Sequence, residues 1–249
     1  MLSSKEITKK QVSIAQGKAS LSIPNLLLLG ILAGMFIAFG ALGSTIVSSS
    51  VGGGLGKLLG ACVFPTGLIL VVMAGAELFT GNCLMAGPML NGQLKWTGVL
   101  KNWLFVYLGN MSGAFLFALL VNGSGLMNAD LAAAAQTIAV NKCALSFGQA
   151  LLRGIGCNIL VCGAVWMASG AQNAGGKAVL CFFPIMLFVV CGFEHSVANM
   201  YYIPLGLLLN AEGVTLSSYL LGNLLPVTLG NIIGGAGLGI AYAMVYREQ

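Results

Sequence analysis

Long apolar runs separated by short polar breaks dominate this chain of 249 residues. Runs longer than about 18 residues predict membrane-spanning helices. Four runs have the length of one crossing and cover residues 24–47, 98–121, 144–168 and 216–245. Two others, 58–90 and 178–209, would form helices of roughly 50 Å against a hydrocarbon core of about 30 Å. Each of these two must therefore tilt strongly, protrude or break.

The composition supports a membrane protein. The chain is 58% hydrophobic and 7% charged, whereas an ordinary soluble domain is about 25% charged. We therefore predict an all-α integral protein that crosses the plasma membrane six times. The net charge of +5 is assigned to topology and to contact with the lipid bilayer, and not to nucleic acid. Most positive charges share one side with the two termini, so both termini are expected in the cytoplasm.

Residues 1–20 precede the first span and mix basic, polar and apolar positions. This pattern is weak, and two interpretations remain open. The segment either forms a short interfacial helix on the cytoplasmic face or is a disordered basic tail.

Three pairs of motifs recur in the same order along the chain. The pattern G-x-E-x-x-x-x-N occurs at 75–82 and again at 192–199, an offset of 117 residues. The pattern N-x-L-x-V-x-L-G-N occurs at 102–110 and at 223–231, an offset of 121. A weaker match joins 27–31 to 151–155, an offset of 124. These pairs predict an internal duplication.

Each copy of the duplication holds three spans, and an odd number inverts the second copy relative to the first. We predict a single transmembrane domain over 1–249, with the first repeat at 21–122 and the second at 144–247. The shared glutamate motif lies near the middle of both overlong regions. Irregular backbone inside a membrane is tolerated where it lines a cavity, so breaks are expected close to 81–82 and 196–199.

Two acids, Glu77 and Glu194, belong to the repeated motif. One interpretation is that each carboxylate accepts hydrogen bonds from the broken backbone or caps a half-helix. The other is direct contact with a transported species, which suits a carboxylate poorly if that species is an anion. Asn82 and Asn199 end the same motif and are expected to satisfy broken backbone as well.

The only histidine, His195, follows Glu194 at the second break. Titratable groups inside a membrane usually mark a polar path, so we predict a pore role; the alternative is a buried neutral ring bonded to backbone. Thr80 lies at the corresponding break of the first repeat, where its hydroxyl can face His195. Lys142 precedes the fourth span and either attracts anions at the outer mouth or is an ordinary interfacial lysine.

The sequence offers little for catalysis or metal binding. It has seven cysteines without a C-x-x-C pair, which we interpret as small buried residues. No group of histidines and no nucleophile with an adjacent base is evident. We therefore expect no enzyme activity, no metal and no cofactor.

Several of these segments resemble the formate/nitrite transporter family. The resemblance covers essentially the whole membrane part and is carried by GAELFTGN (75–82), KNWLFVYLGN (101–110), CNILVC (157–162), GFEHSVANM (192–200) and NLLPVTLGNIIGG (223–235). It implies a homopentamer of aquaporin-like protomers, each with its own pore. It also implies passive or proton-coupled transport of small monovalent weak-acid anions, namely formate or nitrite, with hydrosulfide as the alternative.

The resemblance also implies roles for individual residues. His195 corresponds to the central histidine, Thr80 to the loop threonine, Lys142 to the vestibule lysine and Asn158 to that lysine's neighbour. The remaining matched positions form the constrictions, and they are Phe64, Leu68, Leu78, Phe79 and Phe188.

A mechanism follows from these roles. Apolar rings exclude hydrated ions because stripping water from a charge is costly. The hypothesis is that the anion gains a proton in the vestibule or from His195, crosses as the neutral acid, and loses the proton beyond.

Two competing functions stay open at this point. One is a neutral-solute pore of the aquaporin type, although the chain lacks paired N-P-A motifs. The other is a purely structural membrane subunit. Against the second stand the titratable residues at the two breaks, since such groups inside a membrane usually have a function.

Overall fold

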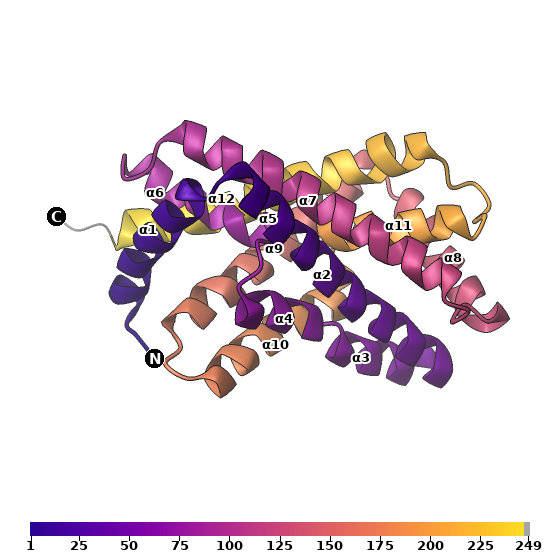
Figure 1. The fold of residues 1–249 in the computed structure, drawn as a ribbon. Coiled ribbons are helices and arrows are strands. Elements are labelled where there is room, and N and C mark those ends of the chain that lie inside the picture. Colours follow the sequence, from indigo (N-terminus) through magenta and orange to yellow (C-terminus); the bar gives the residue numbers. More distant parts are fainter. Residues whose placement is uncertain (247–249) are drawn as a thin grey trace.

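The computed structural model describes residues 1–246, which are helical and contain no strand. Four long helices form the framework of the bundle (Figure 1): α2 (Ile23–Val51), α7 (Trp96–Gly123), α9 (Phe147–Gly170) and α12 (Leu225–Val245). A π-helical segment, η2 (Ser218–Leu224), leads into α12. Figure 1 shows α1, α6 and the end of α12 together at one end of the bundle, and α8 at the opposite end.

Five segments within residues 1–246 are long and apolar enough to cross a membrane, and they cover Ile23–Val51, Gly53–Ala74, Trp96–Gly123, Phe147–Gly170 and Ser218–Val245. A sixth apolar helix, α10 (Ala174–Val190), is shorter. These segments overlap the predicted spans throughout. The chain is therefore a multi-pass helical membrane protein. Residue 247, where the second repeat was expected to end, lies outside the described residues.

The N-terminal segment is an ordered helix, α1 (Ser4–Ser20), so the interpretation as a disordered tail was wrong. Ser3 caps it: the Ser3 hydroxyl accepts from the Glu6 backbone N–H, and the Glu6 carboxylate accepts from the Ser3 backbone N–H. These bonds hold the pKa of the Glu6 carboxyl below its usual range. The helix is tied to the end of α9, because Leu2 N–H donates to the Gly170 carbonyl at 2.9 Å and the Gln11 amide donates to the Ser169 hydroxyl.

A second such helix, α8 (Ala129–Cys143), was missed in the sequence, where residues 122–141 were taken as a connection. Asn128 caps its first turn by accepting from Leu131 N–H at 2.9 Å. Just as α1 precedes α2, α8 precedes α9. Each long framework helix at the start of a repeat therefore has a shorter helix before it.

The first overlong region is broken, but earlier than expected. Helix α3 (Gly53–Val63) is followed by α4 (Thr66–Ala74), which ends at Gly75, where a left-handed φ of 75° terminates the helix. After an extended step the chain resumes as α5 (Phe79–Asn82), η1 (Cys83–Met85) and α6 (Ala86–Leu90). The expected break at 81–82 is therefore wrong, because these residues are already helical. A glycine tolerates left-handed φ at no steric cost, so the motif's first residue makes the break.

The second overlong region repeats this construction. Helix α10 ends before Gly192, which has a φ of 67°, and α11 (Ser196–Leu208) begins directly after His195. The break expected at 196–199 is wrong for the same reason, since those residues form the first turn of α11. In both repeats the irregular backbone lies between the motif glycine and the residue after the glutamate.

Glycines allow the framework helices to pack closely in both halves. A Cβ at Gly109 of α7 would overlap the Leu27 carbonyl of α2, and one at Gly230 of α12 would overlap the Leu151 carbonyl of α9. Gly113 and Gly234 make the corresponding contacts one turn later. Backbones this close are typical of small-residue packing between membrane helices.

Four cysteines, Cys83, Cys157, Cys162 and Cys181, are buried as expected. Cys191 is exposed, so the expectation of burial was wrong there. It lies at the end of α10, where the helix stops beside the left-handed glycine.

Candidate functional site

A buried cluster of polar side chains surrounds the first break. The Glu77 carboxylate forms an ion pair with Lys18, which reaches it from the last turn of α1. It also accepts from the amides of Asn82 at 2.7 Å and Asn102 at 3.2 Å. The Asn82 amide donates in addition to the Asn102 side-chain oxygen at 2.8 Å. The buried charge is therefore neutralised and hydrogen-bonded, as a charge in this position must be.

The second break carries the same cluster. The Glu194 carboxylate pairs with Lys142, from the last turn of α8, at 3.0 and 3.1 Å. It accepts from the amide of Asn199 at 2.7 Å, and Asn199 donates in turn to Asn223 at 2.7 Å. Lys142 also lies 5.3 Å from the Tyr202 ring centroid. Thus Lys142 is not a free charge, and the cluster holds α8, α11 and the π-helix together.

A further asparagine in each half holds the broken backbone itself. Asn110 accepts from Phe79 N–H at 2.9 Å and donates to the carbonyls of Gly30 at 2.8 Å and Glu77 at 2.9 Å. Asn231 accepts from Ser196 N–H and donates to the Gly154 and Glu194 carbonyls over 2.8–3.0 Å. These amides replace the hydrogen bonds that the helices lose at the breaks.

The two breaks meet at one polar contact. The Thr80 hydroxyl lies 2.9 Å from His195 Nε2, and both residues are buried. Thr80 comes from α5 and His195 is the residue just before α11. The structure therefore brings together the two residues that the sequence singled out at opposite breaks.

The other ring nitrogen of His195 is already occupied. Nδ1 accepts from the Ala198 backbone N–H at 3.1 Å, so the side chain caps the first turn of α11. A neutral imidazole has one donor and one acceptor nitrogen. Because Nδ1 accepts, the ring proton is on Nε2 and points toward Thr80. A second proton on the ring, at Nδ1, would face the Ala198 backbone N–H, which is also a donor, and the cap would be lost.

The backbone of Thr80 is held from the opposite side. Its carbonyl accepts from the Asn158 amide at 3.1 Å and from the Cys162 thiol at 3.2 Å, both on α9. Asn158 also donates to the Asn231 carbonyl at 2.6 Å, while its own side-chain oxygen has no hydrogen-bond partner within residues 1–246. Asn158 was expected beside Lys142 but makes no hydrogen bond to it; it positions Thr80 instead.

Aromatic and aliphatic side chains flank the histidine. The Phe188 ring stacks on His195 with centroids 5.9 Å apart, and Phe64 meets Phe188 edge-on at 5.5 Å. Leu68 and Leu78 line a cavity on the side of α1. Phe79 lies apart from this group: its ring packs edge-on against Tyr107 at 4.9 Å and lines an apolar groove between α7 and α12.

The cavity on the side of α1, called here the α1 cavity, has a volume of about 270 Å³. Its walls come from α1, from the first break and from the neighbouring ends of α9 and α10. Three lysines line it: Lys10, Lys18 and Lys177. Ala76, Glu77 and Leu78 of the first break belong to its wall, so the cavity reaches the first break.

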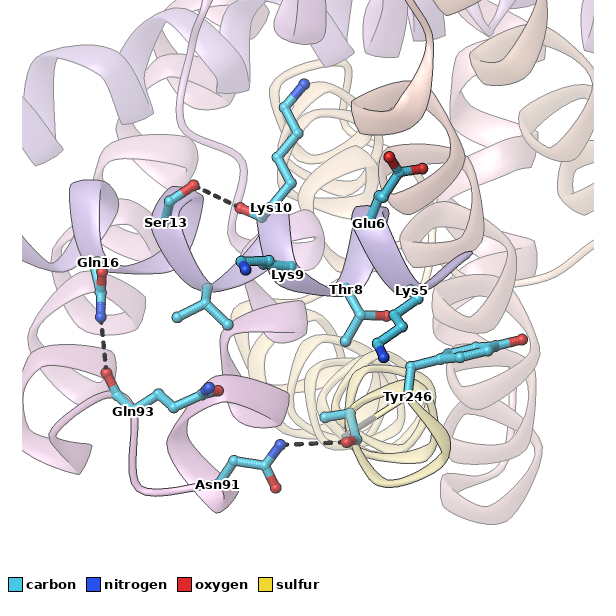
Figure 2. Close-up of a pocket in the computed structure, with 12 residues that line it drawn as sticks. Lys5, Glu6, Thr8, Lys9, Lys10, Ser13, Gln16, Asn91, Gln93 and Tyr246 are labelled. Atoms are coloured by element: carbon cyan, nitrogen blue, oxygen red, sulfur yellow. Dashed lines mark hydrogen bonds between the residues drawn. The ribbon is translucent and has the colours of Figure 1, made fainter. Parts of the chain in front are cut away.

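A larger cavity, of about 600 Å³, lies on the other side of α1 (Figure 2). Asn91 and Gln93 of the loop after α6 line it, together with Tyr246. In Figure 2 the Lys10 side chain leaves α1 on the side opposite Asn91 and Gln93. Helix α1 therefore separates two cavities, and Lys10 contributes to the wall of both.

Sequence reasoning missed several members of these clusters. Lys18 was counted only as a topological charge, although KASLS at 18–22 and KCALS at 142–146 repeat with the offset of 124 found for the neighbouring motif. The remaining four are the asparagines that open and close the second repeated motif, to which no role was given: Asn102, Asn110, Asn223 and Asn231. Their exact recurrence was the signal, since a polar residue copied within an apolar span needs a buried partner.

Comparison with known proteins agrees with this geometry. The family model for the formate/nitrite transporter matches residues 5–246. A probable formate transporter of Methanothermobacter thermautotrophicus is 41% identical, over 90% of this chain and 89% of its own. The formate channel FocA of Escherichia coli K12 is 36% identical, over 89% of this chain and 86% of its own.

Solved structures are similar as well. A pentameric formate channel with formate bound superposes with a TM-score of 0.80 at 32% identity, covering 91% of this chain and 98% of that one. An ion channel of the FNT family gives a TM-score of 0.89 at 27% identity, over 96% and 98% of the two chains. With this similarity along nearly its whole length, and with both glutamate–asparagine clusters in place, the chain belongs to the formate/nitrite transporter family of membrane channels and transporters.

Proposed function

We propose that this chain conducts formate across the membrane through a pore within each protomer, with Thr80 and His195 at its narrow midpoint. The observation that carries the proposal is their 2.9 Å contact, which joins the two breaks. Formate is the first choice because the relatives named above are formate channels or transporters. Nitrite and hydrosulfide are small anions of weak acids too and satisfy the same requirements.

The proposed architecture is one channel domain of six crossings, built as two inverted, aquaporin-like repeats. Neither α10 nor α11 is long enough to cross the membrane alone, and together they form one crossing. The repeat is supported by the duplicated clusters, since each glutamate pairs with a lysine from the helix before its repeat. Five such protomers would form the homopentamer, and both termini would face the cytoplasm.

Apolar side chains on either side of Thr80 and His195 make the passage of an anion energetically costly. Phe64, Phe188 and Leu78 offer no ligand to replace the water around an anion, and moving an unpaired charge into such surroundings is very costly. A carboxylate that gains one proton becomes formic acid and avoids most of this cost. Transport of the neutral acid is proton-coupled, because one proton crosses with each formate.

His195 acts in this scheme as a neutral hydrogen-bond donor. Its Nδ1 is engaged by Ala198 N–H, so Nε2–H is available to a passing oxygen when the Thr80 hydroxyl turns away. Giving up that proton would leave an imidazolate, and a second proton on the ring would break the cap. The proton of formic acid therefore comes from water in the cavity at the entrance, and not from the ring.

The experiment is formate flux in proteoliposomes at two pH values with three forms of the chain. His195→Ala removes both the donor and the cap, so flux should fall by about tenfold or more, as expected for a lost buried hydrogen bond of 1–3 kcal/mol. His195→Asn keeps a neutral donor and a good cap residue but cannot be protonated. Retained flux with an unchanged pH dependence in His195→Asn supports the neutral donor.

Three results would contradict the proposal. Loss of the pH dependence in His195→Asn alone would assign the proton to the ring. Absence of formate, nitrite and hydrosulfide flux in the intact chain would reject transport of this class. Glycerol-driven swelling of the same liposomes would indicate a neutral-solute pore.

A further inference from the structure

The two ends of the pore carry different fixed charge. The α1 cavity holds three lysines and one acid, Glu77. Lys18 and Glu77 form an ion pair and cancel. Lys10 donates to the Ser169 carbonyl at 2.8 Å, which leaves its charge uncompensated. The Lys177 side chain makes no hydrogen bond or ion pair within residues 1–246. The cavity therefore retains two positive charges.

Other charged groups near the cavity do not cancel these two. Glu6 lies one turn before Lys10 on α1, but its carboxylate is held by the Ser3 hydroxyl at 2.7 Å and makes no ion pair with Lys10 in the described part of the chain. Lys5, also on α1, adds positive charge. Among residues 1–246 the balance on this side is positive.

The opposite end lacks the equivalent lysines. When Lys18 is aligned with Lys142, the residue that corresponds to Lys10 is Ala134. When Glu77 is aligned with Glu194, the residue that corresponds to Lys177 is Gly60. Lys142 is paired with Glu194, so that end has no net charge from these positions. Lys57 corresponds to Ala174, which is not part of the α1 cavity wall.

We propose that Lys10 and Lys177 form an anion-accumulating site in the α1 cavity, which makes the pore half-saturate at a lower formate concentration from this side than from the other. This inference rests on the proposed function. Fixed charge in a cleft with low-dielectric walls raises the local concentration of the opposite ion. A passive pore cannot change the equilibrium distribution of formate across the membrane. The lower half-saturating formate concentration on the α1 side is therefore matched by a lower maximal rate of transport from that side.

Sided transport tests the site directly. Formate uptake is measured into membrane vesicles of the two orientations, assigned by protease access to the N-terminus, for the intact chain, Lys10→Gln/Lys177→Gln and the single Lys177→Gln. We expect half-saturation about threefold or more lower when formate enters from the α1 side, with a difference that shrinks as ionic strength rises. The double variant should lose the difference, and Lys177→Gln should lose part of it. Lys57→Gln, which removes a lysine that is not part of the α1 cavity wall, should retain the difference.

Equal half-saturation from both sides in the intact chain, or a difference that survives in the double variant, would overturn the site. Lys177→Gln is the control for misfolding, because the Lys177 side chain makes no hydrogen bond or ion pair within residues 1–246. Lys10, in contrast, ties α1 to Ser169. Vesicles that take up no formate from either side would instead reject the proposed function.

A second measurement does not depend on transport. Ile14 lines the α1 cavity, so Ile14→Trp introduces a fluorescent indole there, and the signal of the chain without this change is subtracted. Iodide should quench this indole more strongly than in the Lys10→Gln/Lys177→Gln background at low salt, while the neutral quencher acrylamide should act equally on both. Identical iodide quenching in the two backgrounds would contradict anion accumulation.

Discussion

The two halves of this molecule share a scaffold and differ in what the scaffold holds. Glu77 and Glu194 each accept from two asparagines and pair with a lysine from the preceding short helix. The next position differs completely, with Leu78 in the first half and His195 in the second. Three residues after each glutamate stand Thr80 in the first half and Val197 in the second.

This difference separates two kinds of polar residue in the membrane. The copied ones neutralise a buried charge and replace lost backbone hydrogen bonds, which every broken membrane helix requires. The residues that are not copied, Thr80 and His195, meet each other. The two halves can therefore share the same supporting contacts while each half supplies a different partner of the central contact.

The largest expected effect comes from removing a scaffold carboxylate. Glu194→Ala leaves Lys142 and two amides without their acceptor, and breaking a buried ion pair costs about 3–5 kcal/mol of unfolding free energy. Glu77→Ala should cost less, because the Lys18 side chain is 24% exposed and water can solvate it, against 15% for Lys142. Thermal and denaturant unfolding in detergent measure both. Exposed Glu212 supplies the control Glu212→Ala, and equal stability of all three variants would refute a structural role for the clusters.

A smaller effect is expected from the close helix contacts. Gly109→Ala and Gly230→Ala each place a methyl group against a backbone carbonyl of the neighbouring helix, and overpacking of this kind costs about 1–3 kcal/mol. The two variants should behave alike, because the contacts are equivalent in the two halves. Gly237→Ala is the matched control, since a Cβ there meets nothing within 4 Å. A stability loss in the control as large as in the other two would remove the packing explanation.

Making the two halves alike at the centre should change stability by less than the glycine variants do, but should change transport strongly. His195→Leu with Thr80→Val gives each position the residue type of its counterpart, and replacing both partners of a hydrogen bond together is nearly neutral. Only the cap on α11 is lost, at about 1 kcal/mol. Formate flux should nevertheless fall by about tenfold or more. A double variant that folds normally and still conducts formate at the original rate would show that the central pair is not needed.

The weakest effect concerns the start of α1. Because the Ser3 bonds lower the pKa of Glu6, this cap stabilises the helix above the ordinary carboxyl range and is lost as the pH falls through the lowered value. Helix α8 begins with Asn128 and keeps its cap unchanged. The hydrogen-exchange protection factors, taken relative to the intrinsic exchange rate at each pH, should therefore fall in the first turn of α1, and not in that of α8, on acidification. Glu6→Gln should abolish this difference.

Much of the fold followed from the sequence, because apolar runs report membrane spans and the recurring motifs report two breaks of similar construction. The meeting of Thr80 and His195 could be anticipated from their places in the repeated motif. The positions of the two breaks were predicted less accurately. Glycine ended each preceding helix, while the polar residues taken as the break proved to be the first turn of the next one.

The ion pairs of Lys18 and Lys142 were the hardest feature to predict from the sequence. Periodicity and charge counting treat Lys18 and Lys142 as loop charges, because their partners lie 59 and 52 residues away. Helix α8 was missed for a related reason: its many alanines carry a weak hydropathy signal between two strong spans. Contacts between distant segments decide both cases, and a single sequence shows them only when the same contact is encoded twice.

The blocked Nδ1 of His195 has a practical consequence for spectroscopy. The chain holds one histidine, so labelling histidine with nitrogen-15 gives two ring signals, and both come from the residue that meets Thr80 at the contact between the two breaks. In the structure described, one of these nitrogens is imine-like and the other pyrrole-like. A change in either signal on adding formate or acid would report the tautomer or the charge of the ring directly.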